Sequence, residues 1–270
     1  MPRHLLPAAL LAALLAVPAG ADPTAGCVTE RTARQLTNSA PDETCVFVRP
    51  GVQVVVVNDD GDQVCQTNYL FYGSDGGKYL GIEGYCVLAE EDCTEMVVLG
   101  FTLCLLGSDP ETDGPVVYPK GKGFPTYLDG KRIGEVRYAV YETGDAFSNF
   151  ALIRLDPKVP SSASIRGWGG PTAVDRRITT EREDVLLTAR ETQHEGVATR
   201  GFYDARAFRG VLPLPTIGLG GPVLTAGGKA VGIVSTAADG AHVERVEPLI
   251  KRAGDRLRIK LRLATAPFGG

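Results

Sequence analysis

The sequence predicts an all-β fold, and three observations indicate it. Runs of apolar, often β-branched residues alternate with clusters of Asn, Asp and Gly, a pattern typical of strands and hairpin turns. The runs are short and recur at intervals of about 8–12 residues, which favours a barrel or a sandwich over a βαβ fold. Only one stretch, near the end of the chain, has apolar residues at helical spacing.

The first half of the chain contains strands that end at recognisable turns. The sequence NDDG at 58–61 and the sequence GSDGG at 73–77 are the clearest turn signals. The strands expected here are residues 52–57, 69–72, 78–82, 133–141 and 151–155. Pro157 and the stretch at 160–162 end the last of them, so we place the boundary between two halves there.

The second half also contains short apolar runs typical of strands, but a helix is expected near its end. Its expected strands are residues 185–188, 197–202, 223–224 and 230–235. Residues 246–253 have the apolar spacing of a helix, with Gly254 as the expected stop. Residues 257–263 then alternate Leu and Ile with charged residues, which predicts a final amphipathic strand.

The first 21 residues have the pattern of a signal peptide, so we expect an exported, extracellular protein. Arg3 and His4 precede an apolar run at 5–17, and AGA at 19–21 fits a cleavage site. The run is shorter than the about 20 apolar residues of a membrane span, so we expect no transmembrane anchor. Lipidation at Cys27 is the alternative, although Thr24 stands where such signals have an aliphatic residue. Residues 22–44 are an N-terminal extension.

Charge and cysteine content exclude other classes of protein. Without Arg3 the chain has 27 basic and 32 acidic residues, which argues against nucleic acid as a partner. Six cysteines behind an export signal predict disulfides in an oxidising compartment. Their positions in the sequence suggest the pairs Cys27–Cys45, Cys65–Cys86 and Cys93–Cys104. No metal-ligand pattern follows them, and only His194 and His242 lie beyond the leader, so we expect neither a metal nor a cofactor.

Three short segments carry a resemblance to a known family. They are residues 79–86 (YLGIEGYC), 148–155 (SNFALIRL) and 216–223 (TIGLGGPV). In order and spacing they resemble the segments of trypsin-like serine peptidases, especially secreted bacterial ones, that hold the histidine, the aspartate and the serine of the triad. Here those three positions hold Tyr85, Asn149 and Leu219.

The resemblance extends from about Cys45 to Leu263 and implies a fold. Further similar segments are VRPGV at 48–52, CQTNY at 65–69, GWGGPT at 167–172 and GKAVGIVS at 228–235. The implied architecture is two packed antiparallel six-stranded β-barrels, residues 45–158 and 159–265, the second carrying the C-terminal helix and strand. In this family the Cys65–Cys86 pair ties the histidine loop to the preceding strand, and the active site lies between the barrels.

The residues at the triad positions lack the chemistry of acyl transfer. A triad needs a hydroxyl nucleophile, a base that takes its proton and a carboxylate that orients the base. Leu219 has no nucleophilic atom, a phenol with a reference pKa near 10 is a poor base at neutral pH, and Asn149 has no charge. His194 and His242 lie in the second half and are expected to be ordinary surface or hydrogen-bonded histidines. The sequence therefore predicts a neutral, partly apolar site.

The oxyanion hole of the family is altered as well. An ungapped alignment puts Ile217 where the family has a glycine that supplies an amide, and a one-residue deletion would put Gly218 there. We expect Ile217, Gly218, Leu219 and Ser235 to line a binding surface, although these residues would fill the same space if they had no function.

The leading hypothesis is an exported peptidase homologue without peptidase activity that binds protein or peptide. The alternatives are an active serine-type endopeptidase or hydrolase with an unrecognised nucleophile, and a purely structural cell-envelope domain.

Overall fold

The computed structural model describes residues 48–88, 93–98, 101–106, 114–141, 149–165, 169–177, 182–189, 192–199, 207–211, 220–237 and 240–268. The chain divides into two units, Met1–Asp42 and Glu43–Gly270, and every described residue belongs to the second. The expected signal peptide and the pair Cys27–Cys45 lie outside the described residues. Within the described ranges, no helix has the length and hydropathy that a membrane crossing requires.

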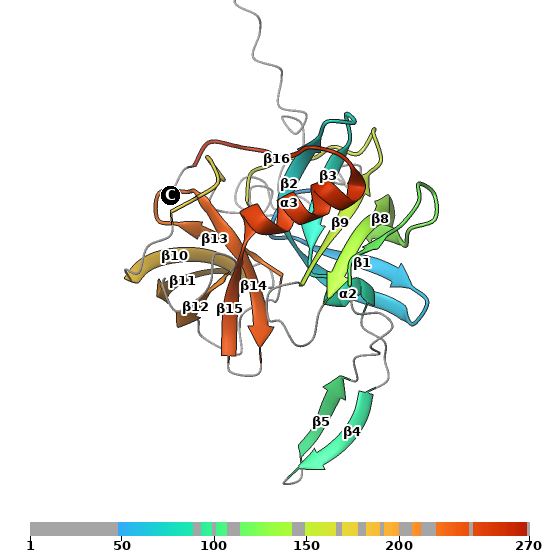
Figure 1. Cartoon of the computed structure of the whole chain (residues 1–270), viewed down its shortest axis with the longest axis horizontal. Helices are drawn as coiled ribbons and strands as arrows, with labels where there is room; N and C mark the ends of the chain where they lie inside the picture. Colours follow the sequence, from blue (N-terminus) through green and yellow to red (C-terminus); the bar gives the residue numbers. More distant parts are fainter. Residues whose placement is uncertain are drawn as a thin grey trace, which may run out of the picture. The chain divides into compact units, whose positions relative to one another are not determined.

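Most strands of the first half form one antiparallel sheet (Figure 1). Its strands are β1 (Gln53–Asn58), β2 (Gly61–Gly73), β3 (Lys78–Ile82), β6 (Val116–Val117), β7 (Pro125–Leu128), β8 (Lys131–Tyr141), β9 (Asn149–Leu155) and β16 (Leu261–Leu263). The order is β1-β7-β8-β9-β3-β2-β16, with β6 paired to β8. Because β2 also pairs with β1, six of these strands form a closed circuit.

The strands of the second half form a closed barrel. They are β10 (Arg182–Ala189), β11 (Thr192–Thr199), β12 (Ala207–Val211), β13 (Pro222–Thr225), β14 (Ala230–Ala237) and β15 (Gly240–Arg245). The order is β10-β11-β12-β15-β14-β13, and pairing of β13 with β10 closes it. The predicted all-β class with two six-stranded circuits is thereby confirmed.

The pattern of apolar residues explains why the first strands form. In β1 the residues alternate between buried and less buried positions, with Val54 and Val56 in the core. Successive side chains of a strand point to opposite faces, so this alternation places one face against the core. The turn at 58–61 then brings β2 back antiparallel to β1, with Asn58 opposite Gly61.

A separate hairpin, β4 (Cys93–Val98) and β5 (Phe101–Leu106), forms a two-stranded sheet. No strand was expected there. Its register places Cys93 opposite Leu106 and Cys104 opposite Glu95. The pairing Cys93–Cys104 stays a prediction.

The C-terminal helix α3 (Val246–Leu257) continues past Gly254, so the expected stop at this glycine is wrong. The helix ends where Arg258 adopts a left-handed backbone, with φ 56°, and the Ile259 N–H donates to the Gly254 carbonyl at 2.9 Å. A Cβ at position 254 would stand 2.8 Å from the Ile259 carbonyl oxygen. This glycine therefore allows a close approach of the chain rather than ending the helix.

The final strand β16 was expected in the second barrel, but it pairs with β2 of the first sheet. Leu261 lies opposite Gly73 and Leu263 opposite Phe71. Leu257 is the last residue of α3 and the strand covers only Leu261–Leu263, so the alternating pattern at 257–263 predicted that a strand is present but not where it starts. It did not identify the partner, because an amphipathic strand is compatible with any sheet edge next to an apolar surface.

One of the two buried clusters combines residues of both halves. It contains Phe71 and Phe150 of the first sheet, Ile233 of the closed barrel, and Val246 and Leu249 of α3. Phe71 and Phe150 meet edge to face, with ring centroids 6.2 Å apart. The first sheet and the closed barrel thus share a hydrophobic core.

The buried phenol of Tyr69 links β2 to the closed barrel. Its oxygen lies 2.6 Å from the Val223 carbonyl and 2.9 Å from the Gly232 carbonyl, and accepts the Val223 N–H at 3.1 Å. Burial raises the pKa of this phenol, and backbone hydrogen bonds with Val223 and Gly232 lower it by a smaller amount. The phenol therefore keeps its proton and donates it within the shared core.

Tyr69→Phe is expected to lower the free energy of unfolding by about 1–3 kcal/mol, because it leaves buried backbone groups without this partner. Tyr72→Phe on the same strand is the matched control. Tyr72 is 44% exposed, so its change is expected to stay within about 0.5 kcal/mol. Urea denaturation of both variants measures the difference, and equal effects would contradict the assigned role.

Candidate functional site

Tyr85 and Asn149, the first two triad positions of the resemblance, lie side by side. Tyr85 is the first residue of the short helix α2 (Tyr85–Leu88), and Asn149 is the first residue of β9. The Tyr85 backbone N–H donates to Asn149 Oδ1 at 2.8 Å. The Tyr85 ring packs edge to face on Tyr141, which lies opposite Asn149 in the β8–β9 register.

Two local features place Tyr85 at this point. Gly84 has no side chain where a Cβ would overlap the Val140 carbonyl oxygen of β8, so the chain passes close to that strand. The amides of Val87 and Leu88 then donate to the Gly84 carbonyl at 2.9 and 3.1 Å, which forms the turn of α2. The contact with β8 and this turn together hold Tyr85 beside β9.

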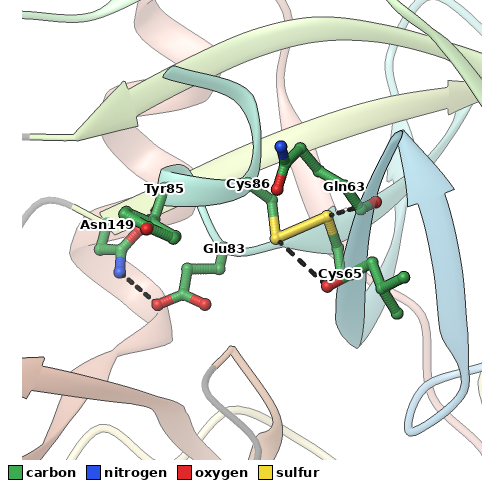
Figure 2. The surroundings of a disulfide bond; sticks show 7 residues. Gln63, Cys65, Glu83, Tyr85, Cys86 and Asn149 are labelled. Carbon is green, nitrogen blue, oxygen red and sulfur yellow. Dashed lines mark hydrogen bonds between the residues drawn. A yellow bond between two sulfur atoms is a disulfide. The ribbon is translucent and has the colours of Figure 1, made fainter. Parts of the chain in front are cut away.

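The predicted disulfide Cys65–Cys86 is present and joins α2 to β2, with the two Cα atoms 6.0 Å apart (Figure 2). It anchors the segment that carries Tyr85 to the first sheet.

The Asn149 side chain is held in one orientation. Its Oδ1 faces the Tyr85 N–H, so its Nδ2 donates in the other direction, to Glu83 Oε1 at 2.7 Å (Figure 2). An amide can make both contacts because it has an acceptor and a donor, whereas an ionised carboxylate is an acceptor only. Asparagine therefore fits this position beside Glu83 in a way that ionised aspartate does not.

A second glutamate reaches Asn149 from the closed barrel. The Asn149 backbone N–H donates to Glu244 Oε2 of β15 at 3.2 Å. Glu83 and Glu244 are both buried, with relative exposures of 5% and 1%. Burial raises the pKa of Glu83 to about 7; the hydrogen bond from Asn149 lowers it, and the charge of Glu244 raises it further.

The third triad position, Leu219, lies outside the described residues, together with Ile217 and Gly218. The next residue, Gly220, is described. It is buried with φ +78°, and a Cβ there would stand 3.0 Å from Glu83 Cβ. The Gly220 N–H donates to the Val234 carbonyl at 2.8 Å. The chain that follows Leu219 therefore reaches Glu83.

The other residues singled out in the sequence lie on the closed barrel. Ser235 is buried in β14 and pairs with His242 of β15. His194 lies in β11, opposite Leu187 of β10.

The expectation of a neutral site is wrong in one respect. The residues at the first two triad positions carry no charge, but two buried carboxyl groups lie next to Asn149. A signal for Glu83 was present in the sequence, since it is the one charged residue in the segment 79–86. No local signal marked Glu244, which is 95 residues from Asn149 along the chain.

The described part of the site can form hydrogen bonds, through Asn149, and can bind or release a proton, at Glu83. Asn149 uses its side-chain oxygen, its side-chain NH₂ and its backbone N–H on protein partners. Burial raises the pKa of Glu83 to about 7, so this carboxyl group gains and loses its proton near neutral pH. In the part of the chain that the structure describes, no group of three or more His, Cys, Asp and Glu side chains is arranged to hold a metal ion.

Comparison with known proteins finds similarity only among solved structures. No protein-family model and no curated protein matches the chain. Thermobifida fusca Protease A is similar with 14% identity and a TM-score of 0.46, and Nocardiopsis protease (NAPase) with 14% identity and a TM-score of 0.48. A glutamic-acid-specific serine protease has 12% identity and a TM-score of 0.48. Each comparison covers 82% of this chain and 100% of the other.

These neighbours are bacterial trypsin-like serine proteases.

Proposed function

We propose that this protein is an exported homologue of trypsin-like serine peptidases that has no peptidase activity and binds a protein or peptide. The observation that carries the proposal is the contact between Tyr85 and Asn149, a backbone N–H donating to an amide oxygen at 2.8 Å. Neither side chain there supplies an imidazole base or a charged orienting group. Leu219 adds no nucleophile at the third position.

Extended peptide is the kind of ligand we propose. Peptides bind sheet proteins by adding a strand to an exposed edge, while pockets select side chains. Ile217, Gly218 and Leu219 are proposed to contact such a ligand, whereas Ser235 of β14 is buried. The predicted signal peptide, residues 1–21, supports the proposal that this binding takes place outside the cytoplasm.

The first test asks whether the protein binds peptide at Leu219. A peptide array on the purified protein is expected to yield a saturable ligand, and Leu219→Asp to weaken its binding about tenfold or more, since an apolar contact is replaced by a charge. Val117→Asp is the matched control, because Val117 is 40% exposed on β6. No saturable ligand, or equal binding by the two variants, would contradict the proposal.

The second test concerns catalysis. A fluorophosphonate probe and a peptide-library cleavage assay are expected to detect no labelling and no turnover above a heat-inactivated control. Labelling of any residue, or cleavage that follows the purified protein, would favour the alternative of an active hydrolase with an unrecognised nucleophile.

A further inference from the structure

The two buried glutamates beside Asn149 belong to different parts of the fold. Glu83 directly follows β3 of the first sheet, and Glu244 lies in β15 of the closed barrel. Asn149 contacts both, through its side-chain NH₂ at 2.7 Å and its backbone N–H at 3.2 Å. Gly220, which leads into β13, lies close to Glu83, because a Cβ added there would stand 3.0 Å from Glu83 Cβ. A pair of carboxyl groups thus lies where the first sheet meets the closed barrel.

We propose that Glu83 and Glu244 form a pH-sensitive contact between the first sheet and the closed barrel. The contact is stable while Glu83 is protonated and loosens when Glu83 ionises. The proposal concerns the conformation of this region and is independent of the ligand proposed above.

Several elements surround Glu83. Asn149 of β9 donates to Glu83, and a Cβ added at Gly220 would stand 3.0 Å from Glu83 Cβ and 3.3 Å from the Gln66 carbonyl oxygen of β2. The titratable groups next to it are Glu244 of β15 and Tyr141 of β8, and the Tyr141 ring in turn packs on Tyr85 of α2. Burial raises the pKa of Tyr141, and the neighbouring Tyr85 and Glu83 raise it further. Arg245, the next residue of β15, is buried as well.

Ionisation of Glu83 is unfavourable in this setting for two reasons. A carboxylate loses its hydration when it is buried, and a second carboxyl group nearby disfavours another negative charge. The hydrogen bond from Asn149 Nδ2 is available to the neutral and the ionised form, and it offsets only part of this cost. When the two glutamates separate and water enters, the Glu83 carboxylate is hydrated again and lies farther from the second carboxyl group.

The sign of the pH dependence follows from the pKa of Glu83. It is about 7 in the folded protein against 4.5 for an ordinary glutamate. Between these values the folded state binds more protons than the unfolded state, so stability falls as the pH rises. The contribution is fully present below pH 4.5 and is lost as the pH passes through about 7.

The experiment is urea denaturation of the purified full-length protein from pH 4 to pH 8.5, followed by far-ultraviolet circular dichroism. For the wild type, Glu83 is expected to raise the unfolding equilibrium constant on the order of 100-fold across this range. Glu83→Gln keeps the shape and removes the titration, so we expect it to remove this part of the pH dependence. An unchanged pH profile in Glu83→Gln would overturn the proposal.

Glu247→Gln is the matched control, because its side chain is 40% exposed on α3 and pairs with Arg176. Its pH profile is expected to follow that of the wild type. Hydrogen exchange, corrected for the intrinsic effect of pH, gives a local readout. Peptides covering 149–155 and 240–245 are expected to exchange faster at pH 8 than at pH 5 in the wild type and equally in Glu83→Gln. Equal exchange at both pH values in the wild type would overturn the proposal.

If Glu83→Gln does not fold, the proposal can still be tested on the wild-type protein. A carbon-13 NMR titration of the glutamate carboxyl groups is expected to show one midpoint near pH 7. If every glutamate titrates below about pH 5, where ordinary carboxyl groups titrate, the proposal is wrong.

Discussion

Asn149→Asp is expected to lower the free energy of unfolding at pH 8 by about 3–5 kcal/mol, the range for an uncompensated buried charge. The change keeps the shape of the side chain and still accepts the Tyr85 N–H. It replaces the NH₂ that donates to Glu83 with a second oxygen, so two carboxylates face each other next to Glu244. Urea denaturation at pH 8 measures the loss.

The loss of unfolding free energy in Asn149→Asp is expected to become smaller at low pH. At pH 3 a protonated carboxyl group donates a hydrogen bond in place of the lost NH₂, so Asn149→Asp approaches the wild type. The sign follows from the linkage relation, since the variant adds a carboxyl group that binds its proton more tightly folded than unfolded.

The compensating variant is Asn149→Asp combined with Glu83→Gln. It exchanges the amide and the carboxyl group between the two positions and keeps the number of buried carboxyl groups unchanged. The NH₂ of the introduced glutamine is then able to donate to the new carboxylate, so we expect most of the lost stability to return. If the double variant is less stable than Asn149→Asp, or Asn149→Asp matches the wild type at pH 8, the assigned hydrogen-bond directions are wrong.

Gly84→Ala is expected to have the second largest effect, a loss of about 3 kcal/mol, at the upper end of the range for overpacking. A Cβ at this position overlaps the Val140 carbonyl oxygen and would stand 2.9 Å from the Phe150 backbone nitrogen. Both neighbours are backbone atoms of strands in the first sheet, so no side-chain rotation relieves the clash. Either α2 or β8 has to move.

Gly227→Ala is the control for this change. Its nearest atom, Thr225 Oγ1, would lie at an ordinary 3.7 Å from the new Cβ. We expect a change within about 0.5 kcal/mol in urea denaturation. Similar losses in Gly84→Ala and Gly227→Ala would mean that the close approach at Gly84 does not hold Tyr85 in place.

The local pattern of the sequence was sufficient for most strands and for one site contact. Lys78–Ile82 was predicted with its observed bounds, because a buried run between two glycine-containing turns has one favourable conformation. The resemblance pointed to Tyr85 and Asn149 as neighbours, and they are hydrogen bonded. The four-residue helix α2 was missed, since one turn of helix is too short to show a periodicity.

The alternation of apolar and polar residues by itself determined that this chain is built of antiparallel strands, because each strand must bury one face. The tertiary structure alone decided that β16 joins the first sheet and that Glu83 and Glu244 meet at Asn149. Contacts of this kind depend on which surfaces meet after the sheets close. Glu83 acquires its unusual proton affinity from that burial and from the nearby charge of Glu244, and the order of residues encodes neither locally.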